Sequence, residues 1–169
     1  GVAAAGISYA GVNASGNALA QIGANTAINS YSGRAGDTLI RARNQSTQEA
    51  LAVSAGLAFG GALVGAIVDI SDTGSTGVVV GNGANIASIG NITLLADEKA
   101  RNSSEARGVA VAGGVGLSVI SSDINVDRDA VVSVGNNAAL SADNITMTAS
   151  FADASNYIAD AQVLGASGG

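Results

Sequence analysis

The sequence predicts an all-β protein, a parallel β-helix (β-solenoid) of about three repeats with a sequence period of roughly 53–58 positions. One observation behind this prediction is a set of turn glycines that recur at a nearly constant interval, at Gly23, Gly81 and Gly135. A second is a set of threonines that open the next apolar run and keep nearly the same interval, at Thr38, Thr93 and Thr146. Self-similarity at one period indicates a solenoid, a propeller or an array, in which neighbouring repeats bury a shared core.

The repeats occupy approximately residues 1–49, 50–105 and 106–158, and residues 159–169 enter the next one. No Pro/Ser-rich linker or change in composition separates them, so we expect a single β-solenoid segment. The chain starts and stops within the pattern. We therefore expect it to be an excerpt of a longer repeat protein.

Each repeat contains a long apolar run, the clearest being GVAVAGGVGLSVI at residues 108–120. Val or Leu alternates with Gly or Ala there, and a period of two favours a β-strand. The run at residues 50–70 is nearly long enough for a transmembrane helix and has GxxxG spacing. Its counterpart at residues 2–12 is too short to span a bilayer. We therefore expect a strand at each of these positions.

Three further strands complete the expected repeat. A short strand precedes each turn glycine, at residues 19–22, 78–80 and 131–134. The turn itself uses Gly and Asn, which tolerate positive φ. A second short strand carries Ile28, Ile86 and Leu140. A final strand begins at the three threonines and becomes polar, and we expect its polar part to face solvent.

Stacking in register places equivalent residues about 4.8 Å apart in ladders that bury aliphatic area continuously. The expected ladders are Ile22/Val80/Val134, Ile28/Ile86/Leu140 and Leu39/Leu94/Met147, beside that of the threonines. The same shift pairs Arg43 with Glu98 and Arg107 with Asp160. Small Ala and Gly faces favour one wide, flattened coil per repeat, with the long strand forming one face. Two ordinary coils per repeat are the alternative.

The composition limits the chemistry that the chain can perform. There is no Cys and no His, which excludes disulfides, thiolate metal sites, His-based catalysis and zinc sites built on these residues. The net charge is −6 and the pI is about 4.2, which argues against nucleic acid and against an anionic membrane surface. We expect no enzymatic activity, no catalytic residues and no cofactor.

Two weaker signals remain. Asp69 and Asp123 are ladder equivalents, and we place Asp72, Asp127 and Asp129 in the same turn region. Stacked carboxylates could hold structural calcium, although a solvated acidic turn is the commoner meaning of such a cluster. Glycosylation sequons occur at Asn13, Asn44, Asn91, Asn102 and Asn144. In a chain this rich in Asn, Ser and Thr, we interpret these asparagines as turn and ladder residues.

The segments at residues 78–96, 108–120 and 132–149 resemble those of giant bacterial β-strand-repeat surface adhesins, the filamentous-haemagglutinin-like and leukotoxin-type repeat proteins. The resemblance implies a β-helical stalk or filament, secreted to the bacterial cell surface, that serves attachment, cell–cell contact or a biofilm matrix. The expected partners are neighbouring repeats, end-to-end copies and a surface receptor whose identity stays open. The alternatives are a toxin-like surface protein with a membrane-active apolar segment and, last, a β-helical polysaccharide-active enzyme.

Overall fold

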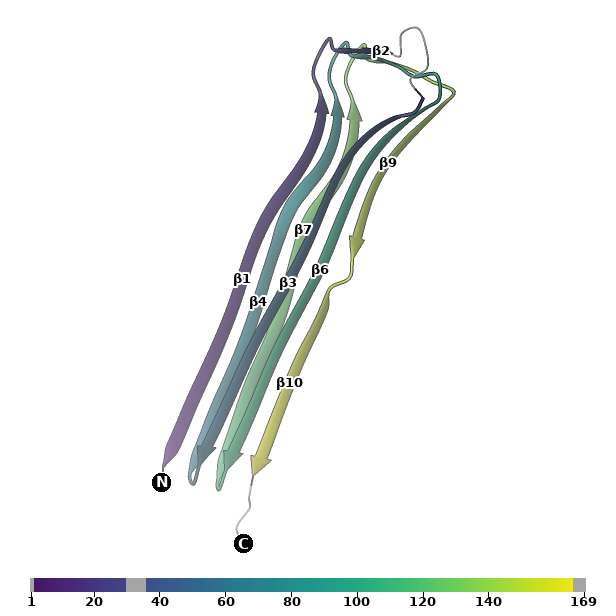
Figure 1. Ribbon diagram of the computed structural model, residues 1–169. Helices are drawn as coiled ribbons and strands as arrows, with labels where there is room; N and C mark the ends of the chain where they lie inside the picture. Colours follow the sequence, from purple (N-terminus) through teal and green to yellow (C-terminus); the bar gives the residue numbers. More distant parts are fainter. Residues whose placement is uncertain (1, 30–35, 166–169) are drawn as a thin grey trace.

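The chain folds as three stacked coils of a parallel β-solenoid (Figure 1). In the computed structural model, residues 2–29 and 36–165 are described. The first coil contains β1 (Ala3–Ile22), β2 (Ala27–Asn29) and β3 (Thr38–Ala58), and the second contains β4 (Gly61–Val80), β5 (Asn85–Ala87) and β6 (Asn91–Ala112). The third contains β7 (Val115–Val134), β8 (Ala139–Ser141), β9 (Asn144–Asp153) and β10 (Asn156–Gly165). No described residue is helical, and the prediction of an all-β fold is confirmed.

Equivalent strands of successive coils pair in parallel, so each repeat forms one wide coil rather than two ordinary ones. Sheet 1 is β1-β4-β7, sheet 2 is β3-β6 with β9 and β10 along the far side of β6, and a small turn sheet is β2-β5-β8. Sheets 1 and 2 lie face to face, and the turn sheet lies across one end (Figure 1). Two expected ladders are present, Ile22/Val80/Val134 and Ile28/Ile86/Leu140.

The ladder of threonines is shifted by one residue between the first and second coils. Thr93 pairs with Thr146 as expected, but Thr38 pairs with Ile92. The next ladder is therefore Ile40/Leu94/Met147, and Leu39 is 61% exposed. Because successive strand residues point to opposite faces, a shift of one residue decides which of them enters the core.

The same shift changes the expected charge pairs. Arg43 pairs with Asp97 rather than with Glu98, and its Nε donates a hydrogen bond of 3.0 Å to that carboxylate. Arg107 and Asp160 are register neighbours as expected, while the ion pair of Arg107 is with Glu105.

The long apolar run at residues 50–70 is not one strand, contrary to our expectation. It bends at Phe59–Gly60, so its first half ends β3 in sheet 2 and its second half begins β4 in sheet 1. The next coil bends in the same way at Gly113–Gly114. We call this end of the flattened coil the arch end. Its peptide groups bond between coils, since Gly113 N–H donates to Ala58 O at 3.0 Å.

A consequence is that the first and second coils each have two long strands, one in each sheet, while the third has β7 in sheet 1 and the successive strands β9 and β10 in sheet 2. The short strand expected at residues 78–80 is the last part of β4, and the strands that begin near the threonines run through their polar part to the arch. That polar part alternates rather than facing solvent throughout. Ser46 and Asn102 are buried within it.

At the opposite end, the turns of the second and third coils each have a glycine that lies close to the backbone of the preceding coil. A Cβ on Gly81 would lie 2.6 Å from Ala24 N, and one on Gly135 would lie 2.6 Å from Asn82 N. The positive φ angles lie two residues further on, at Asn25, Gly83 and Asn137. The predicted Gly/Asn turns are therefore present. Gly81 and Gly135 permit stacking, and the third turn residue adopts the left-handed conformation.

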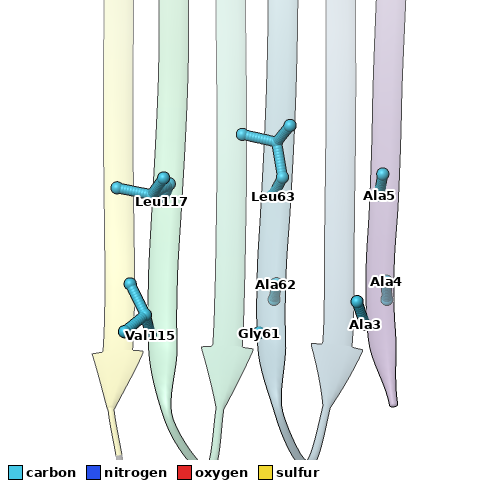
Figure 2. Close-up of a pocket in the computed structure, with 8 residues that line it drawn as sticks. All are labelled: Ala3, Ala4, Ala5, Gly61, Ala62, Leu63, Val115 and Leu117. Carbon is cyan, nitrogen blue, oxygen red and sulfur yellow. The ribbon is translucent and has the colours of Figure 1, made fainter. Parts of the chain in front are cut away.

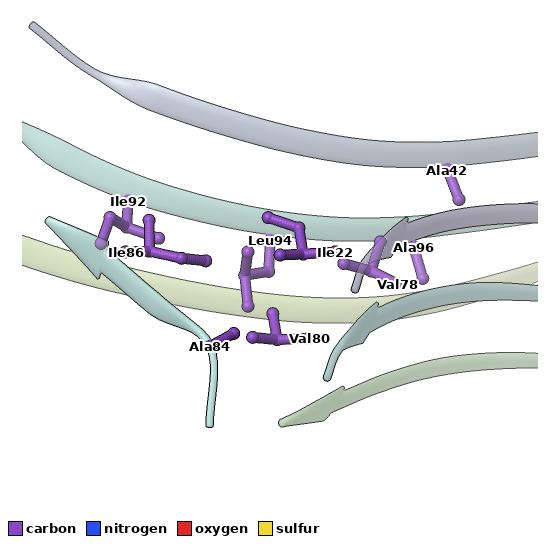
Figure 3. Packing of buried hydrophobic residues seen from close by; sticks show 9 residues of the cluster. All are labelled: Ile22, Ala42, Val78, Val80, Ala84, Ile86, Ile92, Leu94 and Ala96. Carbon is purple, nitrogen blue, oxygen red and sulfur yellow. The ribbon is translucent and has the colours of Figure 1, made fainter. Parts of the chain in front are cut away.

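The core between sheets 1 and 2 changes character along the strands. Near the turn sheet it contains large aliphatic side chains, and Figure 3 shows Ile86, Ile92 and Leu94 filling the space between the sheets. Towards the middle it contains Val68 and Ile70 among alanines. At the arch end only one large aliphatic side chain remains among the core residues, which are Ala58, Ala62, Val64, Ala110 and Ala112.

Candidate functional site

A buried ionic cluster, formed by Asp72, Glu98 and Arg128, interrupts the apolar core. The Arg128 guanidinium donates from Nε to Asp72 Oδ1 at 2.7 Å and from Nη1 to Glu98 Oε1 at 2.8 Å. Its Nη2 lies 2.6 Å from Asp72 Oδ1. The three side chains are at most 2% exposed. Asp72 lies on β4, Glu98 on β6 and Arg128 on β7, so one guanidinium joins both sheets and two coils.

Neutral polar side chains complete the coordination of the two carboxylates. Ser46 Oγ donates to Asp72 Oδ1 at 2.9 Å, and Asn102 Nδ2 donates to Asp72 Oδ2 at 3.0 Å. Thr76 donates its hydroxyl to Glu98 Oε2. Each carboxylate therefore has at least two donors, as buried charged groups require. The carbonyl Oδ1 of Asn102 is buried without a partner.

Arg128 fits between the sheets because glycine occupies its ladder position in the preceding coils. Gly16 pairs with Gly74, and Gly74 pairs with Arg128. A Cβ on Gly74 would lie 2.9 Å from Arg128 Nη1 and would overlap the carbonyl oxygen of Gly16. The empty glycine position leaves room for the guanidinium to reach the carboxylates of the second coil.

Charge pairing and burial act in opposite directions on this cluster. Burial tends to raise the pKa of Asp72, but hydrogen bonds from Arg128, Asn102 and Ser46 outweigh it and hold that pKa below its usual range. Burial tends to lower the pKa of Arg128, and the two carboxylates outweigh it and raise it. Since Asp72 and Glu98 are fully buried, no substrate reaches either carboxylate. The arrangement therefore joins strands and offers no surface for a reaction.

Our sequence interpretation missed this cluster and placed Asp72 wrongly. We expected it in an acidic turn with Asp127 and Asp129, but all three lie within strands, Asp72 buried in the middle of β4 and the other two exposed on β7. A signal was present in the alternation. Asp72 has the same parity as the core residue Ile70, and Arg128 has the same parity as Ile124. Charged residues at core parity in two repeats predict a buried pair.

The candidate calcium ligands Asp69 and Asp123 are register neighbours, as expected, and both are exposed on the outer face of sheet 1. Asp72 does not join them because it points to the opposite face of the strand. Across the described ranges, no group of three or more acidic, His or Cys side chains suits a metal ion. Two carboxylates provide only part of the six to eight oxygens that calcium takes, so calcium binding stays a prediction.

The asparagines of the sequons make structural contacts, those of Asn91 and Asn144 between coils and that of Asn44 between the two sheets of the first coil. Asn44 Nδ2 donates to Gly16 O at 2.9 Å, Asn91 Nδ2 donates to Asp37 Oδ1 at 3.0 Å, and Asn144 Nδ2 donates to Asn91 Oδ1 at 3.0 Å. Asn102 is 1% exposed and belongs to the buried cluster. A glycan on Asn102 is therefore incompatible with this fold.

The outer faces around the arch are apolar on both sheets. On sheet 1, hollows lie between the exposed side chains, and Figure 2 shows one of them with Leu63 on β4 and Val115 and Leu117 on β7. We define the sheet 1 apolar patch as Ile7, Leu63, Ile67, Val115, Leu117 and Val119. The sheet 2 apolar patch is Leu51, Val53, Leu57, Val109, Val111 and Leu164. Exposed apolar surface that continues over several strands marks interaction sites in soluble proteins.

Comparison with known proteins identifies no relative: no family model, curated protein or solved structure matches the chain.

Proposed function

We propose that this chain is a structural segment of the stalk or filament of a secreted bacterial surface adhesin. The observation that carries the proposal is the constant cross-section of the three coils. Each coil adds one long strand to sheet 1 and one long strand, or in the third coil the successive strands β9 and β10, to sheet 2, all in parallel register. A fold that grows by adding equal layers makes a rod whose length follows the number of repeats.

The contacts between coils support a mechanical role for the rod. The long strands pair over their whole described length, from Ala3–Gly61 to Ile22–Val80 in sheet 1. The bonds of Arg128 to the second coil and the contacts of Asn91 and Asn144 add side-chain bonds in the same direction. Pulling along the rod axis would therefore have to break many interactions of one layer together.

The proposal has two tests. In electron micrographs of proteins with added copies of the second and third repeats taken together as a pair, rod length should increase by about 4.8 Å per repeat. A rise of zero, or globular particles, would exclude the stalk. For adhesion, cells that display the parent protein should lose attachment when its repeats are shortened while its other parts stay displayed. Unchanged attachment would exclude this function and leave the rod intact.

A second candidate, a membrane-active surface protein, is favoured by the two apolar patches. Within the described residues, no helix has the length and apolar character to cross a bilayer. The run at residues 50–68 would therefore act as the bent arch rather than as a helix. Release of a dye from phosphatidylcholine vesicles by the folded chain would support this candidate, and intact vesicles would exclude it.

A further inference from the structure

We infer that the outer face of sheet 1 binds the outer face of sheet 2 on a second copy of this chain, so that rods associate side by side. The inference rests on the charges and apolar groups of the two faces, and it holds whether or not the rod serves adhesion.

The two outer faces have opposite charges. Sheet 1 presents Asp69, Asp123, Asp127 and Asp129, and its described strands place no lysine or arginine on that face. On sheet 2, the halves of β3 and β6 nearer the turn sheet present Arg41, Arg43, Lys99 and Arg101 around a single carboxylate, that of Asp97. Asp97 accepts ion pairs from Arg43 at 2.9 Å and from Arg41 at 3.7 Å. Three of the four positive charges stay unbalanced on that part of sheet 2.

The charges lie at matching distances from the arch. Asp127 and Asp129 lie just beyond the middle of β7, counted from its arch end at Val115. Arg101 and Lys99 lie just beyond the middle of β6, counted from its arch end at Ala112. With the usual rise of a β-strand, both pairs are about 40 Å from the arch. Two copies stacked with their arches on the same side therefore place the aspartates of one copy opposite the cations of the other.

The same superposition aligns the apolar patches. Both patches lie in the part of the strands nearest the arch, so the sheet 1 apolar patch of one copy meets the sheet 2 apolar patch of the next. Between the two zones, the carboxylates of Glu49, Glu105 and Asp160 lie near the level of the Asp69–Asp123 ladder. Arg107, which is paired with Glu105, offsets one of their charges. The contact between the two faces is least favourable at this level. It is complementary in the apolar zone nearer the arch and in the charged zone nearer the turn sheet.

The alternatives for the occupant fit less well. Two copies that met through sheet 1 alone would oppose eight carboxylates, and two that met through sheet 2 would oppose their cations. The length and width of a three-stranded sheet of such strands give each face roughly 900 Å², so opposed faces would bury on the order of 1,800 Å². That area lies within the range of specific interfaces, about 1,200–2,000 Å². Since the contact joins two different faces, it repeats from copy to copy and does not close.

The first test is sedimentation velocity on the full chain over a range of concentrations and salt. We expect association that weakens at high salt, because the contact pairs exposed charges. The double variants Asp127→Lys/Asp129→Lys and Lys99→Glu/Arg101→Glu should each weaken association at least about tenfold. An equimolar mixture of the two should restore it, since each variant supplies the charge that the other needs. As a matched control for a single charge reversal, Asp143→Lys, in the turn outside both faces, should leave association unchanged where Asp127→Lys weakens it.

The second test identifies the faces. The chain has no cysteine, so Asn125→Cys on sheet 1 and Ser103→Cys on sheet 2 can be cross-linked without background. A short bismaleimide should join the two variants when they are mixed and should join neither variant to itself. Cross-links within one variant would overturn the inference, and so would association that ignores the charge reversals, which would indicate end-to-end stacking. A chain that stays monomeric but sediments with phosphatidylcholine vesicles would assign the apolar patches to lipid instead.

Discussion

The two ends of the flattened coil solve the same packing problem in opposite ways. Near the turn sheet, the sheets are held apart by Ile86, Ile92 and Leu94, and the outer faces mix charged side chains with the exposed Leu19, Leu39 and Val131. At the arch, the core is mostly alanine, and Leu and Val side chains stand on the outside. Along the same strands, the larger apolar side chains therefore point mainly inward near the turn sheet and mainly outward near the arch. The interior volume thus sets how wide the coil can be, while the exterior determines what the rod can contact.

The ionic cluster lies between these two ends and separates their cores. Asp72 and Thr76 lie between Ile70 and Val78 on β4, and Glu98 lies on β6 at the same level. Replacing an apolar layer with charges gives up hydrophobic burial. A buried ion pair is weak evidence for added stability, but removing one partner is strongly destabilising. The cluster therefore contributes more to which coils and strands pair with one another than to the net free energy of unfolding.

The largest effect should come from breaking this middle layer. Arg128→Met leaves the carboxylates of Asp72 and Glu98 buried without their cation, and we expect a loss of about 3–5 kcal/mol in the free energy of unfolding, measured by urea titration. The matched control is Arg43→Met on the outer face, where an exposed pair contributes about 0–1 kcal/mol. Equal losses for the two variants would show that burial of the cluster is unimportant. The triple variant Asp72→Leu/Glu98→Met/Arg128→Met should recover most of the loss.

The wide end should respond to loss of volume. Leu94→Ala removes a fully buried side chain between the sheets, and we expect a loss of about 2–5 kcal/mol through lost burial and a residual cavity. Leu57→Ala, at a side chain that is 78% exposed near the arch, is the control and should change stability little. If urea titration gave the same loss for both, the assignment of Leu94 to the core would be wrong.

The arch end should respond to gain of volume. Ala110→Leu places three more carbon atoms between closely packed sheets, and we expect a loss of about 1–3 kcal/mol through overpacking. The same change on the outer face, Ala55→Leu, adds carbon atoms that meet solvent and should be nearly neutral. A stabilised Ala110→Leu variant would show that the arch end has spare room and would remove the contrast between the ends.

The smallest effect is the response of the middle layer to acid. The pKa of Asp72 is lower in the folded protein than its usual value, so in acid the unfolded chain binds its proton more readily. Stability from this group is complete above the unfolded pKa of about 3.9, and is lost as the pH falls through the folded pKa. Urea titrations below about pH 4 should show a steeper loss in the native chain than in Asp72→Asn. Parallel losses would show that Asp72 gains no extra protonation on unfolding.

Much of the fold follows from the sequence because stacking makes equal positions meet. The spacing of the repeats alone predicts that Val80 pairs with Val134 and Ile86 with Leu140. The shift at Thr38 was not predictable from the spacing of threonines, because inward parity, which places Ile40 on Leu94, decides the register. The bend at Phe59–Gly60 was hidden within one continuous apolar run. The run is divided because the chain has to pass from sheet 2 to sheet 1 at this point, and the composition of the run does not mark that point.

The cluster was harder to find because its members are far apart in the sequence and belong to two repeats. Glu98 lies in a polar segment, DEKARNSSE, that resembles any solvated strand. Its burial depends on which parity faces the opposite sheet, and on Gly74 leaving room for Arg128. Both features depend on how the coils pack against one another. The spacing of the repeats predicts which residues pair, but not which side chains face the opposite sheet.

The reach of Arg128 from the third coil into the second makes the coils non-interchangeable. Genes with internal repeats lose and gain copies by recombination between similar segments. A chain that lost the third coil in this way would keep Asp72 and Glu98 in its interior without their cation. The buried charge therefore matches two particular layers, so the order of the layers, and not only their number, determines whether Asp72 and Glu98 have their cation.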